Sequence, residues 1–149
     1  MTREEKCKLA IERGYTYNPE TGFIYNPYGK IYKRNVNGYI QLLFSNNENK
    51  IKLYAHQFAW YCQHKQCVEQ LDHINGIRND NRIFNLRAVT QQQNQWNKIN
   101  SKGYCWHRKN NKYQSQIKLN NKLIYLGSFN TEEEARNAYL KAKEIYHKF

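Results

Sequence analysis

The sequence predicts an α+β protein in which antiparallel hairpins lead into a strand–loop–strand–helix segment, followed by a small three-stranded antiparallel sheet packed on one helix. Short runs of Tyr, Phe, Ile and Leu alternate with turns rich in Asn, Gly and Pro, which is typical of antiparallel hairpins. A capping box, Thr90 with Gln93, follows the strand-like run Leu86–Val89 and starts a helix. Near the C-terminus, an apolar stripe at helical spacing follows three further strand-like runs.

The N-terminal half is expected to begin with a helix and continue as an antiparallel platform. Residues 2–13 can form a short amphipathic helix, with Thr2 as its N-cap and Gly14 as its stop. A second helix with one apolar stripe is expected over residues 55–64. Between the two helices, the strand-like segments are residues 15–17, 23–25, 30–33, 39–44 and 51–54.

The segment after this platform carries the residues that indicate chemistry. Asp72 and His73 are neighbours on a strand-like run, and Asn94 falls in the first turn of the helix that Thr90 caps. A carboxylate oxygen of Asp72 and the amide oxygen of Asn94 could hold one hard divalent cation, with water and a phosphate as its other ligands. His73 would face the same phosphate and could activate a water as a general base.

A pattern with fixed spacing runs through this segment: Asp72-His73-Ile74-Asn75-Gly76, Asn79, Asn81, Asn85-Leu86-Arg87, Val89-Thr90 and Asn94. It resembles the ββα-metal motif of the HNH (His-Me finger) endonucleases, in the homing branch of phages and mobile introns. The resemblance implies that Asp72 and Asn94 are metal ligands and that His73 is the general base. It also implies that Asn85 braces the loop and thereby orients His73. Asn94 stands where the family name has His, which favours one Mg²⁺ or Mn²⁺ ion over a softer metal.

After a linker expected at residues 98–102, the chain is expected to form a second module, so that the predicted domains are residues 1–97 and 103–149. Strand-like runs cover residues 104–107, 113–119 and 123–126. Thr131 then caps a helix whose apolar stripe is Ala135, Ala138, Tyr139, Ala142 and Tyr146.

Three motifs carry a second resemblance: Gly103-Tyr104-Cys105-Trp106, Tyr125-Leu126-Gly127-Ser128-Phe129 and Thr131-Glu132-Glu133-Glu134-Ala135. They are similar to the Apetala/ethylene-response-factor DNA-binding domain of plant transcription factors, which also occurs behind HNH nucleases. The resemblance implies a sheet that enters the major groove and reads bases. The chain departs from the family pattern at Cys105–Trp106, where Arg is common, and at Tyr113 and Tyr125, where Trp is common. The residues implied on the DNA face are Trp106, Arg108, Gln114, Gln116, Lys118, Lys122 and Tyr125.

The charge of the chain indicates a polyanionic partner. The net charge is +12 and the pI is near 9.6, and residues 81–131 contain nine Lys or Arg and no Asp or Glu. This balance favours nucleic acid over a membrane surface, so double-stranded DNA is the expected partner. Phosphate contacts are expected from residues near the motif and in the linker, Arg78, Arg82, Arg87, Lys98 and Lys102, and from the platform residues Lys30, Lys33, Arg34, Lys50 and Lys52.

Other features exclude some classes of protein. No apolar run approaches the ~20 residues that a membrane-spanning helix needs, and the N-terminus lacks the apolar region of a signal peptide. A soluble cytoplasmic protein is therefore expected, in the host cytoplasm if a phage encodes it. The four cysteines lack the Cys-x₂-Cys pairs of zinc staples, so no zinc is expected. His56 can either reach the catalytic centre or form a hydrogen bond within the core.

Together, these observations predict a metal-dependent, site-specific DNA endonuclease of the homing type. One motif per chain is expected to nick a single strand, whereas a double-strand break needs a dimer or two encounters. The sequence leaves monomer and homodimer open. The main alternative is a catalytically inactive, sequence-specific DNA-binding regulator that uses the C-terminal sheet, and a protein that binds or cleaves RNA is a third possibility.

Overall fold

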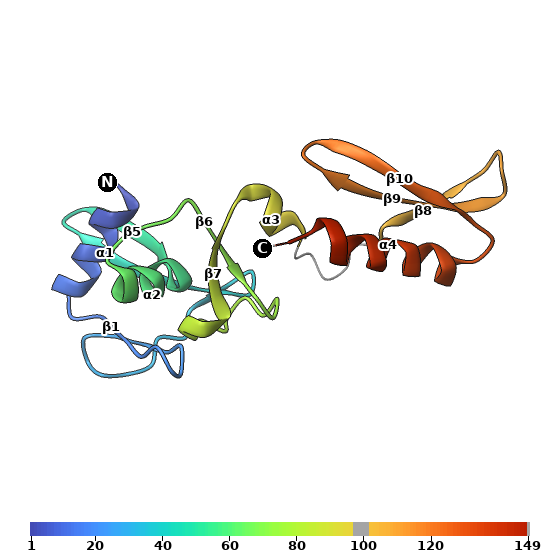
Figure 1. Ribbon diagram of the computed structural model, residues 1–149. Coiled ribbons are helices and arrows are strands. Elements are labelled where there is room, and N and C mark those ends of the chain that lie inside the picture. Colours follow the sequence, from blue (N-terminus) through green and yellow to red (C-terminus); the bar gives the residue numbers. More distant parts are fainter. Residues whose placement is uncertain (97–101, 149) are drawn as a thin grey trace. The chain divides into compact units, whose positions relative to one another are not determined.

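The computed structural model describes residues 1–96 and 102–148, and the chain divides into two compact units, Met1–Thr90 and Gln91–Phe149 (Figure 1). Each unit has a hydrophobic core of its own. The division after Thr90 differs from the domain boundary expected at residue 97. The linker expected at residues 98–102 falls largely outside the described residues and stays a prediction. No helix in the described ranges is long and apolar enough to span a membrane.

The first unit combines two α-helices with small antiparallel sheets. The sheets are β1–β2, β3–β4–β5 and β6–β7. In chain order the elements are α1 (Arg3–Glu12), β1 (Thr16–Tyr17), β2 (Ile24–Tyr25), β3 (Asn35–Val36), β4 (Tyr39–Asn46), β5 (Asn49–Tyr54), α2 (Ala55–His64), β6 (Gln70–His73), the 3₁₀ turn η1 (Ile83–Asn85) and β7 (Leu86–Val89).

Local sequence signals fix both helices of this unit. The Thr2 hydroxyl accepts a hydrogen bond from the Glu5 amide at 3.2 Å, and the Glu5 carboxylate accepts one from the Thr2 amide at 2.6 Å, which completes a capping box on α1. α2 occupies the predicted residues 55–64 and ends at Lys65, whose φ of 57° is left-handed. Both helices therefore form where the sequence predicts them.

The core of the first unit lies between these helices and the β4–β5 hairpin. Along β5 the side chains alternate, because Ile51 and Leu53 are buried while Lys50 and Lys52 are exposed. The buried cluster includes Cys7, Ala10, Leu42, Phe44, Ile51, Leu53, Ala55 and Phe58. Burial of one face of β5 therefore leaves its lysines in solvent.

The predicted strand at residues 30–33 does not form. Tyr25 and Ile31 make an isolated antiparallel bridge, and the next strand begins only at Asn35. The Tyr32 amide also donates to the Ile24 carbonyl oxygen of β2 at 2.7 Å, but the pairing of residues 30–33 with the two-residue strand β2 does not extend further. The platform is therefore shorter at this edge than the sequence pattern indicated.

The second unit contains the predicted three-stranded antiparallel sheet and one long helix. Its elements are α3 (Gln91–Trp96), β8 (Tyr104–His107), β9 (Lys112–Leu119), β10 (Lys122–Phe129) and α4 (Glu132–Tyr146). The strand order is β10–β9–β8, and α4 lies along one face of the sheet (Figure 1). The Thr131 hydroxyl caps α4 by accepting a hydrogen bond from the Glu134 amide at 3.2 Å. Ile117, Tyr139 and Ala142 form the core between helix and sheet.

In the first unit, the β1–β2 hairpin packs against the loop that follows β6. The Tyr17 hydroxyl donates to the Asn81 carbonyl oxygen at 2.6 Å, and the Ile83 amide donates to the Pro19 carbonyl oxygen at 3.0 Å. Gly22 lies so close that an added Cβ would be 2.4 Å from the amide nitrogen of Arg82. The hairpin therefore holds the backbone of the loop from outside the β6–β7 segment.

We expect Gly22→Ala to destabilise the protein more than Gly29→Ala. Both glycines have a left-handed φ, +75° and +73°, but nothing lies within 4 Å of a Cβ added at Gly29. In the Gly29 variant the free energy of unfolding should fall only by the cost of a left-handed φ for alanine, about 1–2 kcal/mol. The Gly22 variant should lose roughly 3 kcal/mol or more, because its methyl group meets loop backbone. Urea unfolding followed by circular dichroism measures both, and equal losses would contradict the close contact.

Candidate active site and nucleic-acid interface

The β6–β7 hairpin positions the two residues on which the catalytic prediction depends. Asp72 and His73 are the last two residues of β6, and they pair with Arg87 and Leu86 of β7. Both residues are polar and yet buried, with 7% and 6% of their surface exposed. Buried polar groups need partners, so the contacts of each residue decide what it can do.

Asp72 forms an ion pair with Arg87. The Arg87 guanidinium donates from Nη2 at 2.8 Å and from Nε at 3.0 Å to the same carboxylate oxygen, Oδ2. The two residues are directly opposite in the strand register, so the hairpin itself brings them together. Arg87 was expected to contact a DNA phosphate. That contact stays a prediction, and it would have to compete with a protein carboxylate.

His73 is held by Asn81, a partner to which the sequence analysis gave no role. Nε2 of His73 donates to Oδ1 of Asn81 at 3.0 Å, and Asn81 is 2% exposed. In this tautomer the basic lone pair of the ring is on Nδ1. Burial lowers the pKa of His73, while the hydrogen bond to Asn81 and the charge of Asp72 raise it. A lowered pKa keeps the imidazole neutral near neutral pH, which is the state a general base requires.

The side chain of Asn85 makes three hydrogen bonds within the loop. Its Oδ1 accepts from the Asn75 amide at 3.1 Å, and its Nδ2 donates to the Asp80 carbonyl oxygen at 2.8 Å and to Oδ1 of Asn75 at 3.0 Å. Asn81 follows Asp80 directly, so Asn85 supports the backbone from which the His73 partner projects. The motif contained Asn81, but only the fold shows which of its asparagines contacts His73.

The two other arginines near the motif also have protein partners. Arg82 forms a two-point ion pair with Asp80, with distances of 2.7 Å from Nε to Oδ1 and 2.5 Å from Nη2 to Oδ2. Arg78 donates to the Asn37 carbonyl oxygen at 3.1 Å, and its guanidinium lies 5.2 Å from the ring centroid of Tyr39. Both side chains have exposed surface, and phosphate contacts from them stay predictions.

His56 lies beside His73 rather than apart from the site. The two ring centroids are 5.3 Å apart in an edge-to-face arrangement, and the His56 ring stacks on Tyr54. Burial and the nearby His73 lower the pKa of His56 to about 3. His56 therefore stays neutral over the ordinary pH range and packs against His73 without adding positive charge.

The oxygen donors predicted for a metal ion belong to different units. Asp72 is in β6, whereas Asn94 is in α3 of the second unit, so their sharing of one ion stays a prediction. Carboxylate and amide oxygens are hard donors that suit Mg²⁺ or Mn²⁺. Because Arg87 holds Oδ2 of Asp72, an ion would bind the other carboxylate oxygen or displace the guanidinium. Among the described residues, no three His, Cys, Asp or Glu side chains gather as a metal cluster.

The outer face of the second unit's sheet carries several of the predicted DNA-contacting residues. Gln114, Gln116 and Lys118 alternate along β9 with Ser115 and Ile117, which are 0% and 1% exposed and face the helix. Tyr125 of β10 is paired directly with Gln116 and therefore lies on the same outer face. Glutamine, lysine and tyrosine side chains are thus presented together to solvent.

Trp106 is on the other face of this sheet. It pairs directly with Tyr113, which has the same strand parity as Ser115 and Ile117, and the Trp106 and Tyr113 rings are 4.8 Å apart. Sequence alone does not fix the β8–β9 register, so only the structure shows that Trp106 lies on the face opposite Gln114 and Gln116. A DNA contact from Trp106 stays a prediction. Arg108 and Lys122 lie beside the turns, Lys102 is exposed, and Lys98 lies outside the described residues.

Comparison with known proteins bears on the first of these two sites. Residues 53–96 match a family model described as HNH endonuclease. The match runs from the end of β5 through α3 and contains Asp72, His73, Asn81, Asn85 and Asn94. Searches of curated proteins and of solved structures gave no match. The match supports an HNH nuclease segment within this chain.

Proposed function

We propose that this protein is a site-specific DNA endonuclease of the homing type that nicks one strand. The observation that carries the proposal is the buried His73, held through Nε2 by Asn81 beside Asp72 at the end of β6. The HNH match over residues 53–96 supports the same reaction class. A neutral imidazole with one nitrogen fixed and the other basic suits proton abstraction from a water.

In this proposal His73 accepts a proton from water at Nδ1 as the water oxygen attacks phosphorus. A new P–O bond forms and the bond to the 3′ oxygen breaks. The leaving 3′ oxygen takes a proton from solvent water, so the products carry a 5′ phosphate and a 3′ hydroxyl. Asn81 keeps the ring oriented, because its Oδ1 accepts the hydrogen bond from Nε2 throughout the reaction. Asp72 and Asn94 would hold one Mg²⁺ or Mn²⁺, which supplies stabilisation of phosphate charge when bound. Arg87 tethers Asp72 and compensates its negative charge.

The second unit is proposed to bind duplex DNA with the outer face of its sheet. Gln114 and Gln116 can read base edges in the major groove, and Lys118 can contact the backbone. Tyr125, 61% exposed, adds a flat apolar surface beside them. The absence of acidic residues from 81 to 131 supports a phosphate-facing surface.

One observation favours the alternative function, a DNA-binding regulator that does not cut. The carboxylate proposed to hold the metal is already paired with Arg87 at 2.8 Å. If that pair persists on DNA, the chain would bind its site without cleaving it. Cleavage assays separate the two functions directly.

We expect His73→Ala to lower nicking of supercoiled plasmid by a factor of about 10²–10⁴, the usual contribution of a general base. DNA binding in a gel shift should change little, because the imidazole is buried. His64→Ala is the matched control, since His64 is an exposed histidine of the same unit. Wild-type protein should convert plasmid to open circles in Mg²⁺ or Mn²⁺ but not in EDTA. A shift without cleavage by the wild type would favour the regulator.

We expect Tyr17→Phe to lower both stability and the nicking rate, although Tyr17 does not contact His73. The variant loses one part-buried hydrogen bond to the loop carbonyl at Asn81. Stability should fall by about 1 kcal/mol, and the nicking rate at saturating protein should fall by several-fold, with unchanged DNA affinity. Tyr28→Phe is the control, because Tyr28 is 87% exposed. Equal nicking rates for the two variants would show that the hydrogen bond from the hairpin does not affect the orientation of His73.

DNA binding should weaken steeply with salt. Each phosphate contact contributes a slope of about −0.9 to a plot of log affinity against log salt concentration. Lys118→Ala should reduce the magnitude of this slope by about 1, whereas Lys8→Ala, on α1, should leave it unchanged. Fluorescence anisotropy with a labelled duplex measures the slope. An affinity that stays flat from low to physiological salt would contradict a phosphate-dominated interface.

A further inference from the structure

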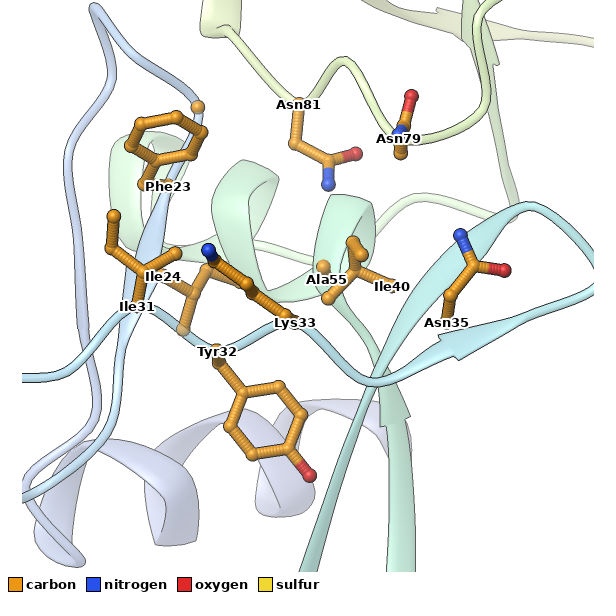
Figure 2. Close-up of a pocket in the computed structure, with 11 residues that line it drawn as sticks. Phe23, Ile24, Ile31, Tyr32, Lys33, Asn35, Ile40, Ala55, Asn79 and Asn81 are labelled. Carbon is orange, nitrogen blue, oxygen red and sulfur yellow. The ribbon is translucent and has the colours of Figure 1, made fainter.

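A cavity of about 350 Å³ lies in the first unit, and Asn81, the hydrogen-bond partner of His73, is one of the residues that line it (Figure 2). Its apolar wall comes from β2 and the segment that follows it, including Phe23, Ile24 and Ile31. The volume is at the lower end of the range of small-ligand sites, about 300–1,000 Å³. The cavity therefore suits one small group rather than an extended ligand.

Asn81 forms a wall that the cavity shares with the active site. Its Oδ1 accepts the hydrogen bond from His73 Nε2, while its Nδ2 points into the cavity (Figure 2). Within the described part of the chain, no residue accepts a hydrogen bond from this Nδ2. Asn81 is 2% exposed, so a hydrogen-bond donor on a buried side chain faces the cavity without a protein partner.

The remaining lining combines apolar surface with a few polar groups. Phe23 and Ile31, 47% and 37% exposed, stand at the rim, where a flat ring could pack against them. Lys33 contributes an ammonium group, and Asn35 and Asn79 contribute amides. Aromatic and apolar surface for stacking, amide donors for ring acceptors and one cation for a phosphate are the features that hold an unpaired nucleotide.

We propose that this cavity binds one unpaired nucleobase of the substrate strand, close to the phosphate that is cleaved. The base packs against Phe23 and Ile31, accepts a hydrogen bond from Asn81 Nδ2, and places its own phosphate near Lys33. This inference rests on the proposed nuclease function and deepens it. One carboxamide then contacts the base at one end and His73 at the other, so base insertion supports the orientation of the general base.

The test uses single-stranded oligonucleotides that contain one 2-aminopurine among thymines, added to the full chain in EDTA at saturating protein. Transfer of the fluorescent base from the strand into the cavity should change its emission by about twofold or more. Phe23→Ala and Ile31→Phe, which remove a wall and narrow the cavity, should abolish most of the change. Tyr28→Ala and Ile11→Phe change residues of similar type that do not line the cavity and should retain it.

Plasmid nicking by the same proteins separates this inference from the proposed function. Nicking with no emission change at saturation, or an equal change in all four variants, would overturn the cavity assignment and leave the nuclease intact. An emission change confined to the wild type and the two controls, without nicking, would keep the base site and remove the nuclease. Circular dichroism checks that the Phe23 and Ile31 variants are folded. Because the two variants alter the cavity in different ways, each is an independent test of the proposal.

Discussion

The candidate site of the first unit depends on the hydrogen bond between His73 and Asn81. His73 belongs to a strand, whose position the β6–β7 ladder fixes, but Asn81 belongs to a loop that has no ladder. The loop is held from two sides, by Asn85 within the motif and by Tyr17 and Pro19 of the β1–β2 hairpin. An imidazole at 3.0 Å from its acceptor is therefore oriented by residues from both ends of the unit.

Charge around His73 is balanced rather than accumulated. Arg87 compensates Asp72, Arg82 compensates Asp80, and His56 stays neutral beside the ring. A nuclease whose substrate is a polyanion gains from this balance, because uncompensated carboxylates near the site would repel the phosphate. In the proposed function, a metal ion and the Arg87 guanidinium compete for the Asp72 carboxylate. The nuclease and the regulator therefore differ in whether this one ion pair persists.

The sequence predicted what short-range signals determine and missed what tertiary contacts determine. Capping boxes and apolar periodicity predicted α1, α2 and α4, and the resemblance to the HNH motif implied that Asp72, His73 and Asn85 act as a group. The contact of Tyr17 with Asn81 joins residues 64 positions apart, which no local pattern indicates. The face of Trp106 depends on strand register, and the pairing of residues 30–33 with β2 is limited to a single bridge. Roles in metal and DNA binding depend on molecules other than this chain and stay proposals.

The contact between the hairpin and the loop also constrains how the site can form during synthesis. Tyr17 and Gly22 leave the ribosome long before Asn81 and Arg82. The hairpin therefore cannot form its contacts with the loop until the loop has been synthesised. Closing a chain segment of this length carries an entropic cost before any contact compensates it, and long-range contacts slow folding. A nascent chain that ends before the loop would therefore carry the hairpin without its partner. The geometry of His73 would be completed late, as one of the last steps in folding of the first unit.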